Sequence, residues 1–473
     1  MIAAASAPSR TAPAGPISAV SVAVVLALVT SAYPGASNLR LVGAVAACVV
    51  IAAWALIAFR QPRTATIAAI GMVLVAGTKF RLREATDTLA GVVDWQIALE
   101  LGVFALVGVA VMAIFAAGRL HRARSRAAEV LILAYVALAL VSTSWSEAPV
   151  LTLVRAVQLS IVAGLAVVSV RILSPSRAIW TTCCALATYV LACALSTAVF
   201  ASETTADFEE PTFRFAWFAV HPIAAGTLAA IAALGMFSPS IFRRAGAHRI
   251  AGIPRLLLLA SLLVILVLTN ARGPLLAFLA GAGILMLMRT TVPIRLLLLG
   301  TASAVLFAFL LTGTDFRSWL AQASSHESIM TRMLLREQTV DTVLSLHGRL
   351  ELWNDLRPAI AAHPVFGYGY QASREVVLDT APWAAFAHNA LLQTMLDLGG
   401  VGAVALIALV VLGCTGAFRR TLNPWLRASL AALMVFLAVN SISTESFAGS
   451  PGFETLIFMV CVLCAAPRRE MPR

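Results

Sequence analysis

His388 is a residue whose type and position suit acid–base chemistry. It follows a long polar segment and directly precedes an apolar run that begins at Asn389. That run predicts a helix whose first turn lies at the water–membrane boundary. The helix dipole and nearby guanidinium groups disfavour the imidazolium there, so a neutral His388 is a competent general base near pH 7. The alternative is an interfacial histidine that only caps the helix.

Two arginines lie at similar borders between apolar runs and polar connections. Arg272 stands in the short connection formed by residues 269–274, and Arg155 lies just inside the apolar run that starts at residue 150. Each also has a structural interpretation. Arg272 could anchor the chain at the membrane interface, and Arg155 could snorkel outward or pair with Glu147.

Several arginines and one histidine on one membrane face suggest chemistry on a diphosphate. Arginine forks bind diphosphate bidentately and stay charged at any relevant pH. They can neutralise a diphosphate leaving group without a divalent metal, while the histidine deprotonates an incoming hydroxyl group. A lipid-diphosphate donor would explain why such a site belongs in a membrane.

The composition indicates that membrane helices must position these residues. Of the 473 residues, 60% are hydrophobic and only 12% are charged, whereas about a quarter of the residues of a soluble protein are charged. No single water-soluble core hides so much apolar sequence, so a bilayer must be the solvent for most of it.

The apolar runs predict an all-α, polytopic bundle of about 12 to 14 spans, each close to the ~20 residues that a span needs. Residues 17–312 form the N-terminal transmembrane helices and residues 389–466 the C-terminal ones. Glu100 and Asp397 fall inside spans, where structural pairing is their expected role. The candidate segments are 17–33, 41–59, 64–79, 95–117, 127–143, 150–172, 177–199, 216–237, 252–269, 275–288, 295–312, 389–414, 427–441 and 454–466.

The charges between the spans predict the orientation. With the N-terminal tail (1–16) in the cytoplasm, arginines collect in one cytoplasmic loop after another, and acidic residues collect in the outer loops. The C-terminal tail (467–473) is then cytoplasmic as well, and the first apolar run is a retained span rather than a signal peptide. The net charge of +12 therefore reflects membrane topology, and we expect no nucleic-acid partner.

One outer loop, residues 313–388, is far longer than the others, which is typical of a functional loop. Its second part predicts an amphipathic helix on the membrane surface or on the bundle, because apolar residues recur at helical spacing. Pro364, Gly367 and Gly369 then predict a turn. The helical positions are Leu352, Trp353, Leu356 and Ile360.

The cysteines predict no metal centre. All seven lie in apolar runs, where packing is their expected role. Cys461 and Cys464 have a metal-like spacing, but a bare apolar segment supplies no further ligands. We therefore expect no metal site, no cofactor and no disulfide framework.

Three motifs make the chain resemble the O-antigen ligase and polymerase superfamily of membrane glycosyltransferases. The first is Arg272 with a leucine four residues later, after an apolar run. The second is Gly348-Arg349 with Trp353, followed by residues 363–369, and the third is His388-Asn389 with Gly399. The resemblance is strongest over residues 268–405, and residues 145–155 are similar to a weaker family pattern.

The resemblance implies a metal-independent, inverting glycosyltransferase that acts on the periplasmic face of a bacterial inner membrane. Its donor would be a glycan on undecaprenyl diphosphate. By the same resemblance, His388 would activate the acceptor hydroxyl, and Arg272 and Arg349 would bind the donor diphosphate. Arg155 and Arg214 would belong to the same anionic site.

Three functions stay open at this point. A polymerase joins repeat units into O-antigen or exopolysaccharide, and a chain-length regulator would then be a further partner. A ligase transfers a finished glycan to lipid A-core. The aromatic end of the long loop favours an exopolysaccharide polymerase. A transporter or lipid flippase belongs to another class and would hold its substrate near the midplane, whereas the conspicuous polar residues here lie at the outer face.

Overall fold

The computed structural model describes nine stretches of the chain. The predicted spans 17–33 and 295–312, both tails and the first part of the long loop lie outside them. The described residues are 37–78, 94–120, 126–199, 214–217, 220–237, 249–250, 252–289, 348–381 and 383–466.

The described chain is all-α apart from one hairpin, in which β1 (Arg249–Ile250) pairs with β2 (Ile253–Pro254). The α-helices are α2 (Ser37–Arg60), α3 (Pro62–Ala76), α5 (Trp95–Ala116), α6 (Arg126–Val141), α7 (Pro149–Leu173), α8 (Pro175–Val199), α10 (Pro222–Met236), α12 (Arg255–Leu268), α13 (Arg272–Arg289), α18 (Arg349–Asp355), α19 (Arg357–Ala362), α20 (Arg374–Thr380), α21 (Ala390–Ala417), α22 (Pro424–Ser443) and α23 (Phe453–Ala465). Two short 3-10 turns are η1 (Ser142–Ser144) and η2 (Ser446–Ala448).

The helices confirm the predicted polytopic membrane fold. Every predicted span inside the described residues coincides with a helix. Six of these helices, α5, α6, α7, α8, α21 and α22, are long and apolar enough to cross a membrane, and the others, such as α10 and α12, are shorter apolar helices. The chain is therefore a multi-pass membrane protein.

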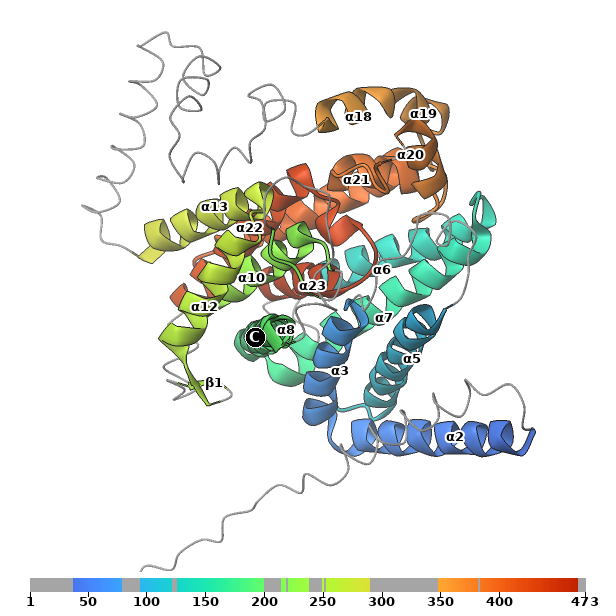
Figure 1. Cartoon of the computed structure of the whole chain (residues 1–473), viewed down its shortest axis with the longest axis vertical. Helices are drawn as coiled ribbons and strands as arrows, with labels where there is room; N and C mark the ends of the chain where they lie inside the picture. Colours follow the sequence, from blue (N-terminus) through green and yellow to red (C-terminus); the bar gives the residue numbers. More distant parts are fainter. Residues whose placement is uncertain are drawn as a thin grey trace, which may run out of the picture.

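The helices pack against one another in a bundle (Figure 1). α13 runs along α22, and α10 lies among α8, α12, α13 and α22. A Cβ on Gly281 of α13 would lie 2.8 Å from the carbonyl oxygen of Ala432, so no larger residue fits between these two helices. In a bilayer, such contacts and not the hydrophobic effect hold helices together.

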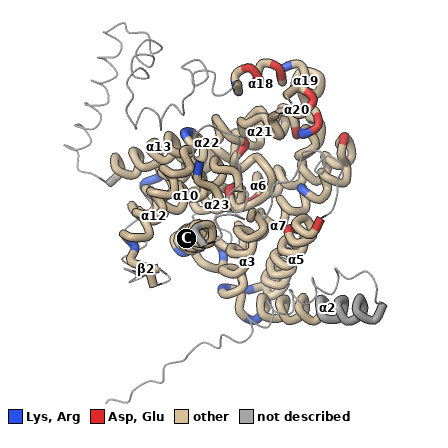
Figure 2. The backbone as a smooth tube through the Cα atoms, viewed as in Figure 1, with Lys and Arg blue, Asp and Glu red and all other residues tan. Residues whose placement is uncertain are grey.

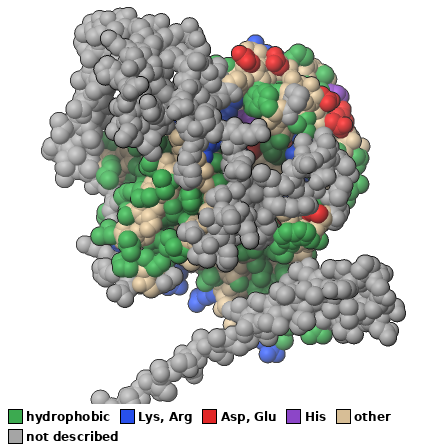
Figure 3. Space-filling model, in the orientation of Figure 1, with side chains coloured by type: hydrophobic (Ala, Val, Ile, Leu, Met, Phe, Trp, Pro, Cys, Tyr) green, Lys and Arg blue, Asp and Glu red, His purple; other side chains and the backbone are tan. Residues whose placement is uncertain are grey.

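Apolar side chains gather on the described parts of the face seen in Figure 3. Val150, Leu256 and Met112 are among the large hydrophobic residues that are mostly exposed. An exposed apolar surface of this kind is expected where a protein faces lipid.

The second part of the long loop folds onto the bundle as predicted. α18, α19 and α20 lie together beside the start of α21 (Figure 1). Leu352 and Leu356 are buried, and Trp353 and Ile360 pack against them, which confirms the amphipathic pattern. Acidic residues gather on α18 and α20 (Figure 2).

The motif of residues 364–369 has a structural explanation, because this segment pairs with a break in α21. Gly399 has φ 63° and ψ −160° inside that helix, so neighbouring peptide groups lose their helical partners. The 364–369 segment supplies new ones. Its bonds run from Tyr368 N to Leu396 O, from Gly369 N to Asp397 O, from Gly400 N to Pro364 O and from Val401 N to Val365 O.

Glycine is required on both sides of this pairing. A Cβ on Gly399 would lie 2.3 Å from the carbonyl carbon of Val365, and one on Gly367 would lie 2.4 Å from the carbonyl oxygen of Leu396. Both glycines also have positive φ. The recurring glycines therefore let the two backbones approach each other closely.

Replacing Gly399 with alanine is expected to destabilise the fold. The backbone conformation alone should cost about 1–3 kcal/mol, and the contact with Val365 adds to it. Thermal unfolding in detergent should show a clear drop in melting temperature. Gly102→Ala on α5, where a Cβ meets nothing within 4 Å, should change little, and equal melting of both variants would contradict this explanation.

Candidate active site

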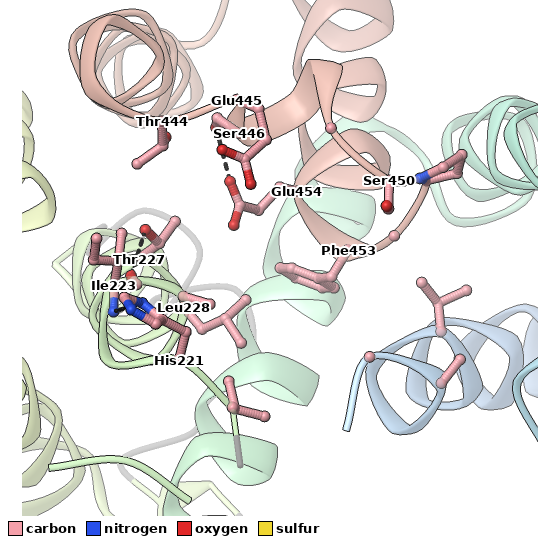
Figure 4. A pocket seen from close by; sticks show the side chains of 18 of the residues that line it. His221, Ile223, Thr227, Leu228, Thr444, Glu445, Ser446, Ser450, Phe453 and Glu454 are labelled. Carbon is pink, nitrogen blue, oxygen red and sulfur yellow. Dashed lines mark hydrogen bonds between the residues drawn. The ribbon is translucent and has the colours of Figure 1, made fainter. Parts of the chain in front are cut away.

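A cavity of about 530 Å³ lies where several helices end (Figure 4). Most of its wall is apolar, and six charged or histidine side chains line it. They are Glu100, Arg155, His221, His388, Glu445 and Glu454.

The cavity lies at helix ends that the predicted topology assigns to one membrane face. Its lining includes the ends of α3 and α22 and the beginnings of α7, α10, α21 and α23. In the predicted topology, α3 and α22 run towards the outer membrane face, and α7, α10, α21 and α23 start from it. The predicted topology therefore brings these ends to the same face. The cavity thus lies towards one end of several of these helices.

His388 stands immediately before α21 with an uncommon backbone conformation, φ 50°. Its Nδ1 atom lies 3.5 Å from Oε2 of Glu445. The ring is stacked on that of Trp383, with 6.1 Å between centroids and 7° between planes. The imidazole is therefore held at the cavity wall between a carboxylate and an indole.

The backbone around His388 is fixed from several sides. Trp353 Nε1 donates to the carbonyl oxygen of Ala387 at 2.9 Å, and Ala387 N–H donates to Oε1 of Gln393 at 3.0 Å. Asn389 caps α21, since its side-chain oxygen accepts from the second and third residues that follow it. Its Nδ2 donates to Ile442 O at 3.1 Å. These bonds maintain the positive φ of the histidine.

Asp397 serves as the structural partner that the sequence predicted. It is buried and accepts hydrogen bonds from Ser373 Oγ at 2.6 Å, from Gln393 Nε2 at 3.1 Å and from Gln371 Nε2 at 3.3 Å. Gln393 also donates to Ser373 Oγ. The network thus ties the long loop to α21 and reaches Ala387, next to His388.

Gln393→Met, which keeps the side-chain length but removes the amide, should destabilise the protein. It leaves the buried Asp397 and Ala387 groups with fewer partners, and each lost bond of this kind costs about 1–3 kcal/mol. Chemical or thermal unfolding in detergent measures the effect. Thr380→Ala, which removes a bond within one helix, is the control, and a Gln393→Met variant as stable as that control would disprove the network's role.

Arg155 also lines the cavity, but its partner differs from the Glu147 that the sequence suggested. Its Nη1 lies 2.7 Å from Oε1 of Glu100 and 2.8 Å from Oε1 of Gln158. Glu100 in turn accepts from Gln158 Nε2 at 3.0 Å. Because Glu100 lies 55 residues away on α5, local sequence did not reveal this pair.

The other three predicted arginines, Arg214, Arg272 and Arg349, are not among the residues that line the cavity. Arg349 begins α18, and burial lowers the pKa of its guanidinium group. The positive charge of Arg214 lowers this pKa further, whereas the carboxylate of Glu445 raises it. Arg349 therefore lies within electrostatic reach of both. Arg272 begins α13, and a Cβ on the next residue, Gly273, would lie 2.6 Å from Ser443 Oγ at the end of α22.

The sequence reasoning missed Glu445, His221 and Glu454. His221 caps α10 by accepting from the N–H of Ile223 at 3.2 Å, and Glu454 accepts from Ser446 Oγ at 2.7 Å. All three stand in connections or helix starts on the predicted outer side. Topology could have placed them at the right membrane face, but not beside His388.

Comparison with known protein families finds a match to part of the chain. Residues 256–407 match the family model described as O-antigen ligase. The match includes Arg272, Arg349 and His388 and ends within α21. No curated protein matches the chain. The match over residues 256–407 thus supports membership of the chain in the O-antigen ligase and polymerase superfamily.

Proposed function

We propose that this protein polymerises an exopolysaccharide or O-antigen from a glycan linked to undecaprenyl diphosphate. The observation that carries the proposal is the cavity at one end of the bundle, which His388 and Arg155 both line. Arg349 lies within electrostatic reach of Glu445, which lines the same cavity, and guanidinium groups suit an enzyme that handles an anionic lipid. The working face would be the periplasmic face of a bacterial inner membrane, with both termini in the cytoplasm.

In the proposed reaction, His388 takes the proton of an acceptor hydroxyl, and the resulting oxygen nucleophile attacks the anomeric carbon of the donor sugar. The bond between that carbon and the diphosphate breaks, and its electron pair leaves with the diphosphate oxygen. Arg272 and Arg349 bind the diphosphate, with Arg155 and Arg214 in the same anionic site. Because this is one displacement, the anomeric configuration inverts.

Arginine makes this chemistry feasible without a divalent metal. The guanidinium group keeps its charge at any relevant pH and offers two parallel N–H donors to one phosphoryl group. Stabilising charge that develops on a leaving group is the largest single contribution in many enzymes. The arginines would supply it here.

Ligation to lipid A-core is the second candidate, and the description of the matching family supports it. The acceptor alone separates the two activities. Aromatic residues on the loop favour the polymerase, because Trp383 stacks on His388 and Phe386 lines the cavity, where they would contact sugar rings. A flippase would move the lipid-linked glycan without cleaving it.

A transfer assay separates these functions. Purified protein in nanodiscs would receive undecaprenyl-diphosphate repeat units in EDTA, with and without lipid A-core. We expect longer lipid-linked glycans and free undecaprenyl diphosphate in both mixtures. Glycan on lipid A-core only would favour the ligase, and unchanged donor in every mixture would contradict the proposed function.

A further inference from the structure

We infer that Glu445 is a positioning residue that orients His388 and stabilises the imidazolium formed when His388 accepts a proton. The inference rests on the proposed function, because it needs His388 to be the base. It assigns a catalytic partner on the connection after α22, beyond the segment that the family model matches.

The pair has the geometry that this role requires. Nδ1 of His388 lies 3.5 Å from Oε2 of Glu445, and the two side chains are 25% and 26% exposed. Both line the cavity. A substrate in the cavity can therefore reach the pair, although most of each side chain is shielded from solvent. The bond from Asn389 Nδ2 to Ile442 O also joins the two backbones beside the pair.

The carboxylate decides which nitrogen can act as the base. A carboxylate accepts hydrogen bonds, so it favours the tautomer of His388 that carries its proton on Nδ1. The lone pair is then on Nε2, on the opposite side of the ring. The stacked Trp383 ring limits rotation of the imidazole, and Nε2 therefore remains the nitrogen that meets the acceptor hydroxyl.

The surrounding charges keep Glu445 ionised. Burial raises its pKa, but the hydrogen bond and the charge of His388, together with the charge of Arg349, outweigh that effect and leave the pKa below its ordinary value. Glu445 is thus an acceptor at neutral pH. Its own position is fixed, because Ala448 N donates to its carbonyl oxygen at 2.9 Å, and a Cβ on Gly449 would lie 2.6 Å from its Cγ.

The carboxylate of Glu445 also stabilises the positive charge that forms on His388 during the reaction. The N-terminus of α21 and Arg349 both oppose a positive charge on His388. Both would therefore resist the proton that His388 must accept. The negative charge of Glu445 offsets this resistance as the proton moves from the acceptor oxygen to Nε2, and Glu445 itself stays deprotonated throughout.

Glu445→Gln tests the inference, because it keeps the shape of the side chain and removes its charge. We expect kcat to fall by about 10²-fold with little change in KM for the donor. We also expect the acid limb of the pH–rate profile to move to lower pH, because the imidazolium loses the neighbouring anion that stabilises it. Glu445→Asp should recover part of the rate.

Other charged or titratable groups surround the pair and contribute to that profile, and the charge of Glu445 itself acts on Arg349 and Glu454. These groups are Arg349 from α18, Glu454 from α23, and Glu100, Arg155 and His221 from the cavity wall, with Arg214 acting on Arg349. Glu375→Gln, on the exposed side of α20, is the matched control and should keep the wild-type rate and profile.

The outcomes separate this inference from the proposed function. If Glu445→Gln keeps the full rate and an unmoved acid limb while His388→Ala is inactive, Glu445 has no role in catalysis and the base assignment stands. If both variants stay fully active, the base assignment fails as well. If Glu445→Gln is slow with an unmoved acid limb, or melts at a lower temperature in proportion to its lost rate, the role is structural and the inference is overturned.

Discussion

His388→Ala is expected to lower the rate of glycan transfer by about 10²–10⁴-fold, the contribution that a positioned general base makes. The histidine lies on the cavity wall between Glu445 and Trp383, so its loss removes the proton acceptor and leaves the arginines in place. Donor affinity should therefore stay near the wild-type value while kcat falls. Release of undecaprenyl diphosphate by purified protein, measured over a range of donor concentrations, gives both quantities.

A second histidine provides the control for that variant. His363 ends α19 and packs on Tyr368, with 4.3 Å between ring centroids, and it is exposed and absent from the cavity that His388 lines. His363→Ala should keep most of the activity. Full activity of His388→Ala, or equal losses in both variants, would show that the imidazole of His388 does not perform the proton transfer.

Arg349→Lys is expected to reduce kcat/KM for the donor by about 10- to 100-fold, even though it preserves the charge. A hydrogen bond to a charged group contributes about 1.5–3 kcal/mol, and lysine cannot reproduce the bidentate fork of arginine. The main change should be a higher KM, with a further loss in Arg349→Ala. Donor titrations with the two variants measure it.

Arg357 offers a matched control on the neighbouring helix. It begins α19 and is exposed, so Arg357→Lys should behave as the wild type. A fully active Arg349→Lys variant would rule out bidentate binding of the diphosphate at this position. Equal losses in the two lysine variants would point to a general effect of the loop helices.

The sequence predicted the fold well because membrane helices leave a strong local signal. A run of about 20 apolar residues can hardly be anything but a span, and the described helices start and end close to the predicted limits. The amphipathic stretch from Arg349 was equally readable. Its periodicity singled out Leu352, Trp353, Leu356 and Ile360, of which the two leucines are buried and the other two pack against them.

The pairings inside the site could not be predicted in the same way. Glu100 meets Arg155, and Glu445 meets His388, across separations of dozens of residues. Such contacts depend on how the helices pack, and the local pattern carries no information on that. Likewise, nothing in the sequence showed that Gly399 breaks α21 and that the 364–369 segment fills the break.

The most direct test of the central claim is a structure of the protein in a nanodisc with an undecaprenyl-diphosphate sugar, trapped in the His388→Ala variant. The account predicts a diphosphate held by Arg272 and Arg349, with the sugar in the cavity next to residue 388. In a companion structure with wild-type protein and a non-cleavable donor, an acceptor hydroxyl should lie about 2.6–3.2 Å from Nε2 of His388. A diphosphate bound away from these arginines, or a glycan near the bilayer midplane, would contradict the account.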